Sequence, residues 1–175
     1  MTDVAFGGDG VIDELVAIIN AAYLTGEVGI WLEGWRRVTR ETVERLIAAG
    51  EMAVAWRHDR PVGCVRTRRL DAHTAELGML SVDPAAHRTG AGRALIAFAE
   101  RAFDVDEMEL ELLVPRGAPH PDKVRLDAWY RRLGYRVVGR RDFAEPLLAA
   151  PADLVVYRKN LRAAPANEAP LRAPT

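Results

Sequence analysis

Two closely spaced glycines, Gly90 and Gly92, mark the stretch best suited to binding a charged ligand. They follow an apolar segment that ends at Asp83-Pro84, and they precede residues 93–103, where apolar residues recur at helical spacing. A turn from strand to helix leaves the first helical N–H groups unpaired, with the positive end of the helix dipole behind them. Such a turn is typical of phosphate binding, although the same glycines also suit a tight structural corner.

The residues around these glycines exclude two common phosphate-binding motifs. The chain has no G-x-x-x-x-G-K-S/T sequence, and it lacks the third glycine of the dinucleotide-binding fingerprint. The remaining pattern resembles motif A of the GNAT acetyltransferase superfamily, Q/R-x-x-G-x-G/A after a strand that ends in Val-Asp-Pro. Here it falls on His87-Arg88-Thr89-Gly90-Ala91-Gly92. His87 is a departure, because the family has Gln or Arg at that position.

A second segment strengthens the resemblance. Residues 128–135 read Ala-Trp-Tyr-Arg-Arg-Leu-Gly-Tyr and are similar to motif B of the same family, which ends in Tyr-x-x-x-Gly-Phe/Tyr. Two motifs in the family's order are far more specific than either one alone. Lys123 and Leu126 stand where the commoner motif B has Asn and Ala. Lys123 either reaches the phosphates of coenzyme A or lies solvated in a first helical turn, and its type favours the solvated position.

The resemblance implies a GNAT domain over residues 1–161 and a reaction in which an amine attacks the thioester of acetyl-CoA directly. It implies that a strand pairs with the pantetheine arm and that the turn holds the pyrophosphate. The implied cofactor-binding residues are Leu80, Ser81, Val82, His87, Arg88, Thr89, Gly90, Ala91, Gly92 and Arg93. No metal is expected. A non-catalytic acyl-CoA-binding or sensing module is the alternative, and an unrelated anion-binding domain is a third interpretation.

Two catalytic residues follow from the resemblance. Tyr130 lies four residues before Gly134, at the position of the family's general acid, and its ordinary pKa of about 10 keeps it protonated until a thiolate leaves. Glu76 lies four residues before Leu80 on the same strand and matches the general base that some members use, often through water. Each residue also has a structural interpretation: a tyrosine that packs a helix on the sheet, and an exposed carboxylate on a strand.

The acceptor of the acetyl group is less well defined by the sequence. Residues 25–38 contain Trp31 and Trp35 among three glycines. These tryptophans either cover one end of the core, which large aromatic residues more often do, or wall a substrate cleft in which Glu27 or Glu33 attracts an amine. The implied acceptor is a primary amine of a small molecule or of a protein or peptide, and fold alone does not decide between them.

The elements that must position these residues follow a defined order. We expect an α/β (α+β) fold, with a central, mostly antiparallel mixed sheet flanked by helices. The expected helices cover residues 11–23, 40–49, 93–103 and 122–133, with Asp9, Thr39 and Asp122 as N-caps and with Gly50 and Gly134 after the second and fourth. The expected strands cover residues 4–6, 52–58, 62–70, 73–82, 106–114, 135–139 and 154–157.

Length and composition indicate one domain. The chain has 175 residues, enough for one good core, and its 24 basic and 25 acidic side chains give no indication of nucleic-acid or acidic-membrane binding. Its single cysteine, Cys64, excludes an intramolecular disulfide and is expected in the core. With no signal peptide or membrane-spanning segment, a cytoplasmic protein is expected. Residues 162–175, rich in Ala and Pro, are expected to be flexible, and a homodimer is compatible with the resemblance.

Overall fold

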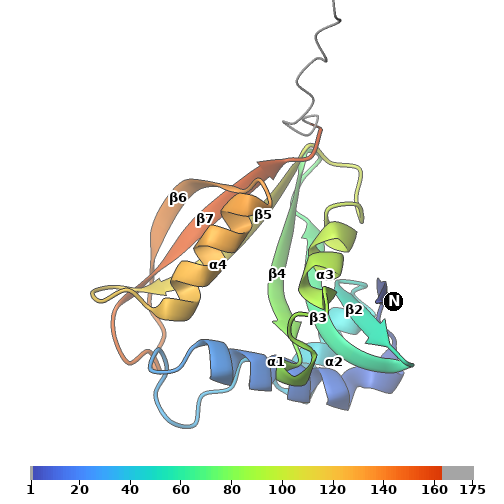
Figure 1. The fold of residues 1–175 in the computed structure, drawn as a ribbon, viewed down its shortest axis with the longest axis horizontal. Helices are drawn as coiled ribbons and strands as arrows, with labels where there is room; N and C mark the ends of the chain where they lie inside the picture. Colours follow the sequence, from blue (N-terminus) through green and yellow to red (C-terminus); the bar gives the residue numbers. More distant parts are fainter. Residues whose placement is uncertain (1, 163–175) are drawn as a thin grey trace, which may run out of the picture.

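The structure, a computed structural model, describes residues 2–162 (Figure 1). Its helices are α1 (Ile12–Gly26), α2 (Arg40–Ala48), α3 (Ala91–Ala99) and α4 (Pro121–Arg132), with 3-10 turns at Asp9–Val11 and Pro84–Ala86. Its strands are β1 (Asp3–Phe6), β2 (Met52–Arg57), β3 (Arg60–Arg69), β4 (Thr74–Val82), β5 (Glu107–Pro115), β6 (Arg136–Phe143) and β7 (Ala152–Asn160). The predicted order of elements is confirmed. Apart from Arg162, the expected flexible tail lies outside the described residues.

Within the described residues the strands form one sheet in the order β1-β2-β3-β4-β5-β7-β6. The β4–β5 pair is parallel and the other neighbouring pairs are antiparallel, so the predicted mixed sheet is confirmed. Parallel pairing joins only residues 74–77 of β4 to residues 107–110 of β5. Beyond that point the two strands diverge (Figure 1). The sheet therefore opens in its middle, and the β5-facing edge of β4 has no strand partner there.

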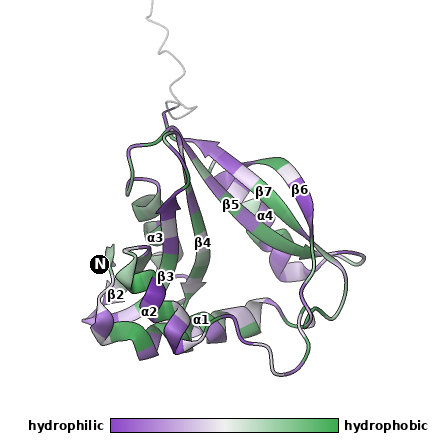
Figure 2. Ribbon diagram, turned by 180° about the vertical axis from the view of Figure 1, so that it is seen from behind, coloured by the Kyte–Doolittle hydropathy of each residue, from purple (hydrophilic) through white to green (hydrophobic). Residues whose placement is uncertain are grey.

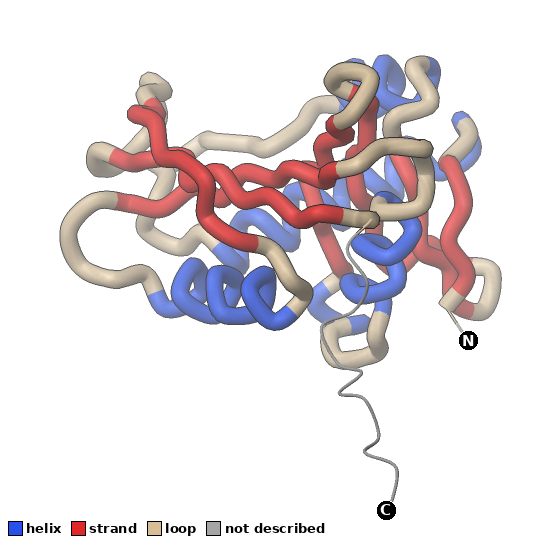
Figure 3. The backbone as a smooth tube through the Cα atoms, turned by 90° about the horizontal axis from the view of Figure 1, so that it is seen from above, coloured by secondary structure: helices blue, strands red, loops and turns tan. Residues whose placement is uncertain are grey.

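Helices cover both faces of the sheet because side chains alternate along the strands. On β2, Ala53 and Ala55 belong to the core cluster that includes Leu95 of α3, whereas Val54 belongs to the cluster that includes Leu15 of α1. Figure 2, viewed from behind, shows β2 to β4 with α1 to α3 in one half and β5 to β7 with α4 in the other. Figure 3 shows the strands and helices from above. The opening between β4 and β5 separates these halves.

Two predicted helix caps are wrong. Asp9 begins a 3-10 turn, and the residue that precedes α1 is Val11, whose side chain makes no capping hydrogen bond. Asp122 lies inside α4, which starts at Pro121 after His120. Proline suits the first helical position, because its ring fixes a helical φ and its missing N–H would be unpaired there anyway. The prediction placed both caps from residue type alone, each two positions from the observed N-cap residue.

The other predicted element ends are confirmed in part. Thr39 caps α2 as expected, because its hydroxyl accepts a hydrogen bond from the Thr42 N–H at 3.3 Å. The third helix ends at Ala99 rather than Phe103, since the next N–H groups, of Arg101 and Ala102, bond three residues back and tighten the chain into a turn. Strands β6 and β7 extend beyond the predicted residues 135–139 and 154–157. The additional residues include charged ones that pair across strands, and their composition alone does not indicate a strand.

The lone cysteine lies where it was expected. Cys64 is fully buried on β3, in the cluster beneath α1 and α2. Burial raises the pKa of its thiol to about 12, so at neutral pH it is an uncharged packing group.

Candidate active site

The turn between β4 and α3 presents a run of free backbone donors. None of the six N–H groups from Arg88 to Arg93 donates a hydrogen bond to a described residue. Gly90 begins α3 with φ +87°, and Arg88 also has a positive φ of +63°. Left-handed residues are uncommon outside glycine, and such conformations gather at binding sites. Consecutive N–H groups in a turn of this kind suit an anion, so the residues present fit a phosphate group.

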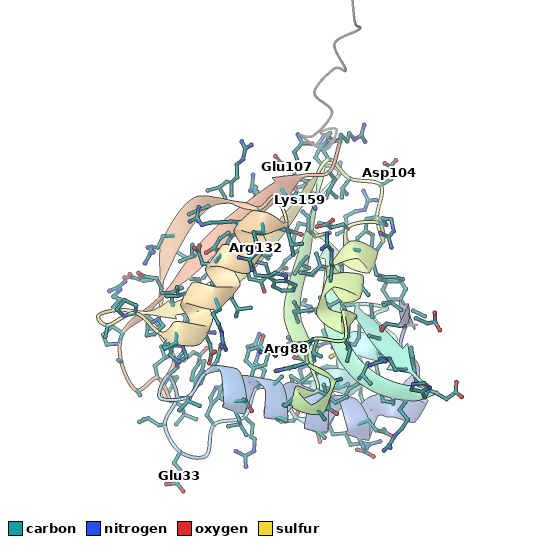
Figure 4. All side chains as sticks on the ribbon, in the orientation of Figure 1. Glu33, Arg88, Asp104, Glu107, Arg132 and Lys159 are labelled. Carbon is teal, nitrogen blue, oxygen red and sulfur yellow. The ribbon has the colours of Figure 1, made fainter. Side chains whose placement is uncertain are left out.

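The side chains of this turn are arranged around its backbone. The Thr89 hydroxyl donates to the Ala86 carbonyl at 2.7 Å, which ties the turn to the preceding 3-10 segment. His87, Arg88 and Arg93 are exposed. In Figure 4 the Arg88 side chain extends from the turn toward the half of the molecule that contains α4. Thr89 thus shapes the turn, while the three cationic or titratable side chains are accessible to a ligand.

A ligand that leaves this turn meets the open edge of β4. Met79 has φ +49°, and the register with β3 shifts between Cys64 and Arg66, so β4 carries a bulge just before Leu80. Ser81 is buried, and its hydroxyl donates to the Met79 carbonyl at 3.1 Å. Leu80 and Val82 are half-buried. The bulge redirects the strand away from β5, which leaves its backbone edge open to an extended ligand.

A cavity of about 360 Å³, here called the central cavity, lies where β4 and β5 diverge. Residues 77–80 of β4 and 110–113 of β5 line it. The C-terminal end of α1, the following loop and α4 also contribute side chains, and so do β3, β6 and β7. The side chains used below are Tyr23, Glu27, Trp31, Arg37, Arg66, Glu76, Glu111, Lys123, Tyr130, Arg141 and Phe143.

Tyr130 lines the central cavity and is 7% exposed. The rings of Trp129, Tyr135 and Tyr157 surround it, with centroids 5.4, 6.1 and 5.9 Å away. Its hydroxyl makes no hydrogen bond with another described residue. Burial raises the pKa of Tyr130 well above its usual value, and the nearby hydroxyls of Tyr23 and Tyr157 add to that rise. The phenol is therefore protonated throughout the physiological range, and it both packs in the core and faces the cavity.

Glu76 also lines the central cavity. Arg68 lies opposite it on β3, and its Nε donates to Glu76 Oε2 at 2.6 Å. The other carboxylate oxygen, Oε1, accepts no hydrogen bond from a described residue. The guanidinium therefore orients the carboxylate and leaves one oxygen for water or substrate.

The two predicted tryptophans have different positions. Trp31 lines the central cavity and also packs edge-on against Phe143, at 6.3 Å between ring centroids. Trp35 stacks on Trp31 at 4.1 Å but does not line the cavity. Both interpretations of Trp31, as packing group and as cavity wall, thus describe it. Glu33 is exposed and does not line the central cavity, and Figure 4 shows it at the outer tip of its loop, so its role toward the acceptor stays a prediction.

The sequence analysis missed the role of a buried ion pair. Lys123 Nζ bonds to Glu27 Oε1, and the two side chains are 5% and 6% exposed. The Trp31 indole N–H donates to the other oxygen of Glu27 at 2.5 Å. Lys123 neither lies solvated nor extends to the phosphate turn. The one signal in the sequence was its departure from the usual asparagine of motif B. Because the pair joins the end of α1 to the start of α4, it ties the two sides of the cavity together.

Tyr23 and Arg37 also line the central cavity and contact each other. The Arg37 guanidinium carbon lies 4.9 Å from the centroid of the Tyr23 ring. Burial raises the pKa of Tyr23, and the Arg37 guanidinium opposes that rise. The backbone around Arg37 is anchored, because its N–H and that of Val38 donate to Asn20 Oδ1 at 2.8 and 3.2 Å.

The sequence of residues 48–137 matches the family profile of the acetyltransferase (GNAT) domain. This match covers just over half of the chain and includes both motifs. The chain belongs to the GNAT acetyltransferase family. The prediction of an acetyl-CoA-dependent N-acetyltransferase is thereby confirmed at the level of family and reaction class. No curated protein matches the sequence. Among the described residues of this GNAT protein, no helix has the length and apolar character needed to cross a membrane.

Solved structures share the fold of this GNAT chain at low sequence identity. The protein smu.2055 from Streptococcus mutans UA159 has a TM-score of 0.71 at 17% identity, over 91% of this chain and 99% of that one. The ribosomal-protein-alanine N-acetyltransferase from Brucella melitensis has a TM-score of 0.69 at 20% identity, over 90% and 99%. The protein yncA from Salmonella typhimurium, solved with its cofactor acetyl-CoA, has 0.70 at 17% identity, over 97% and 99%. This likeness confirms the predicted fold.

Proposed function

We propose that this protein transfers the acetyl group of acetyl-CoA directly to a primary amine, with Tyr130 as the general acid and Glu76 as the general base. One observation carries the proposal. Tyr130 and Glu76 line the same cavity, and that cavity lies beside the open edge of β4, whose far end leads to the free N–H groups at residues 88–93. A turn suited to phosphate, the open backbone edge of β4, and a cavity lined by Glu76 of β4 and Tyr130 of α4 therefore follow one another along the course that acetyl-CoA would take.

The binding steps use backbone groups. The N–H groups of residues 88–93 would hold the pyrophosphate, and Arg88 and Arg93 would add charge-assisted contacts. The β5-facing edge of β4, from Leu80 to Val82, would pair with the pantetheine arm. The thioester then reaches the central cavity, where a backbone N–H near Leu80 would stabilise the oxyanion of the tetrahedral intermediate.

The chemical step moves two protons. The amine nitrogen forms a bond to the thioester carbonyl carbon and loses a proton to Glu76, directly or through a water on its free Oε1. The C–S bond then breaks, and the coenzyme A thiolate takes the Tyr130 proton. The phenolate regains a proton from solvent. Burial favours this role because it keeps Tyr130 neutral until a thiolate forms beside it.

The acceptor belongs to the class of primary amines. The names of similar structures span several acceptors, including a ribosomal-protein alanine and, in an N-acetylglutamate synthase from Neisseria gonorrhoeae, an amino acid product. Either a small-molecule amine or the amine of a protein or peptide therefore suits this proposal. We place the reaction in the cytoplasm, where acetyl-CoA is made and used.

Calorimetric titration with acetyl-CoA tests the cofactor part of the proposal. We expect binding by the wild type and its loss in Gly90→Glu, because the new carboxylate would lie in the phosphate turn. Transfer to amines, followed by release of free thiol, tests the catalytic part. Tyr130→Phe should bind acetyl-CoA normally and transfer acetyl about 100-fold or more slowly, the usual scale of a lost general acid. Binding without transfer by the wild type would instead indicate a sensing module, and absence of binding would refute both.

A further inference from the structure

Almost every charge that lines the central cavity is already neutralised by an ion pair. Two of these pairs lie wholly within the lining, and in two others one member lines the cavity and its partner lies behind it. The pairs are Lys123–Glu27, Arg141–Glu111 (2.7 Å), Arg68–Glu76 (2.6 Å) and Arg66–Glu51 (2.7 Å). The three carboxylates of the lining are therefore each held by a cation.

Arg37 is the exception. It lines the cavity, yet within residues 2–162 no carboxylate oxygen lies within 4.0 Å of its guanidinium. Its contact is with the face of the Tyr23 ring, which holds the guanidinium by a cation–π interaction. The hydrogen bonds from its backbone and from Val38 to Asn20 keep the loop in place. Among the described residues that line the cavity, Arg37 thus carries the one charge without an ion-pair partner, and this residue is exposed to solvent.

This pattern decides between classes of amine. A polyamine keeps one or more ammonium groups when one nitrogen reacts, and it would need a free carboxylate in the cavity to bind them. An amine with a carboxylate close to the reacting nitrogen needs instead a free cation in the cavity. Arginine suits it well, because the planar guanidinium binds a carboxylate with two parallel hydrogen bonds.

We propose that the acceptor is an amino acid or a close analogue, a small primary amine whose carboxylate binds Arg37. The inference rests on the proposed function and names the substrate class of the same site. The central cavity, about 360 Å³, is at the small end of ligand pockets and suits a small acceptor. With the carboxylate on Arg37 at the Tyr23 side, the amine points into the cavity that Tyr130 and Glu76 also line.

Matched acceptor pairs test this assignment. Initial rates of coenzyme A release from acetyl-CoA are measured with phenylalanine and phenethylamine, and with leucine and 3-methylbutylamine, with spermidine as the polyamine. We expect at least one α-amino acid to be acetylated with a kcat/KM at least 10-fold above that of its decarboxylated partner. Arg37→Gln should lower that value about 10- to 100-fold, mainly through KM, because it removes a charge-assisted hydrogen-bond pair.

The control variant is Arg36→Gln. Arg36 is the neighbouring exposed arginine, its side chain donates to the Trp35 carbonyl at 2.9 Å, and it does not line the central cavity. We expect it to leave the preference for amino acids intact. Arg37→Gln should change the rate with a decarboxylated amine much less than the rate with its amino acid. That asymmetry distinguishes carboxylate binding from a general loss of structure.

Three results would overturn the assignment. They are preference for spermidine or a decarboxylated amine, equal losses on both members of a pair in Arg37→Gln, and no acetylation of any amino acid. Calorimetry with acetyl-CoA on the same preparation separates these results from failure of the proposed function. A protein that binds acetyl-CoA and acetylates another amine keeps its function and loses only this substrate class.

Discussion

The buried pair of Glu27 and Lys123 allows a quantitative prediction. Replacing Lys123 with Met leaves the Glu27 carboxylate buried with only the Trp31 N–H as partner, because the two charged side chains are 6% and 5% exposed. Removing one member of a buried ion pair typically costs about 3–5 kcal/mol, since the remaining charge is desolvated without compensation. A domain of this kind is stable by about 5–15 kcal/mol, so Lys123→Met should lose about a fifth or more of that stability.

The double variant Glu27→Leu with Lys123→Met should recover most of the loss. Two apolar side chains need no charge partner, and replacements of whole buried pairs are often neutral or stabilising. The free energy of unfolding is measured by urea denaturation, followed by circular dichroism and by tryptophan fluorescence. Agreement between the two probes and an unchanged m-value establish that a two-state comparison is valid.

Arg125→Met is the matched control. Arg125 lies on the same helix and pairs with Asp122, but its side chain is 79% exposed, so water compensates for the lost partner and little stability should change. The reasoning would be refuted if Lys123→Met lowered the free energy of unfolding by less than about 1 kcal/mol. It would also be refuted if the losses of Lys123→Met and of Glu27→Leu, each measured alone, added up in the double variant. Either result would mean that the pair is solvated.

Two further predictions concern the tyrosines and the glycine turn. Burial raises the pKa of Tyr23, Tyr130, Tyr135 and Tyr157, so the native protein should show almost no phenolate absorbance at about pH 10, where free tyrosine is half ionised. Because the pKa values of these tyrosines are higher in the folded than in the unfolded protein, their contribution to stability is complete below about pH 10 and is lost as the pH rises further. Tyrosines that are half ionised at about pH 10 in the folded protein would contradict their burial. In the turn, Gly90→Ala should lower the free energy of unfolding by about 1 kcal/mol, because φ is +87° there. Gly92→Ala should be neutral or stabilising, since its Cβ would meet Trp129 at an ordinary 3.5 Å. Both variants are measured by thermal or urea unfolding. Equal effects of the two substitutions would show that backbone conformation does not distinguish Gly90 from Gly92.

Features governed by local chemistry were predictable from the sequence. Gly90 and Gly134 take positive φ values, as turns after a strand and after a helix require, and Thr39 caps its helix. These outcomes depend on a few neighbouring residues, so residue type and spacing predict them. The two family motifs are local in the same sense, because each is a short turn or helix.

The extent of β6 and β7 was not predictable in this way. Residues 140–142 read Arg-Arg-Asp, which is typical of a loop, yet they continue β6 because their partners lie on other strands. Arg140 bonds to Asp153 at 2.8 Å, and Arg141 donates to Glu111 through Nε and Nη2. Cross-strand pairing stabilises a charged segment that its own composition does not favour as a strand.

The sequence by itself determined the family, the order of the elements and the glycine turn before α3, because these depend on local spacing. Only the tertiary structure decided which charges of the cavity are compensated. Glu27 and Lys123 are 96 positions apart, and each alone has the composition of a solvated surface residue. Whether a charge is buried, paired or free depends on the distance and desolvation that folding creates. For that reason the acceptor class, unlike the reaction, could be inferred only after Arg37 was found without a carboxylate partner among the described residues.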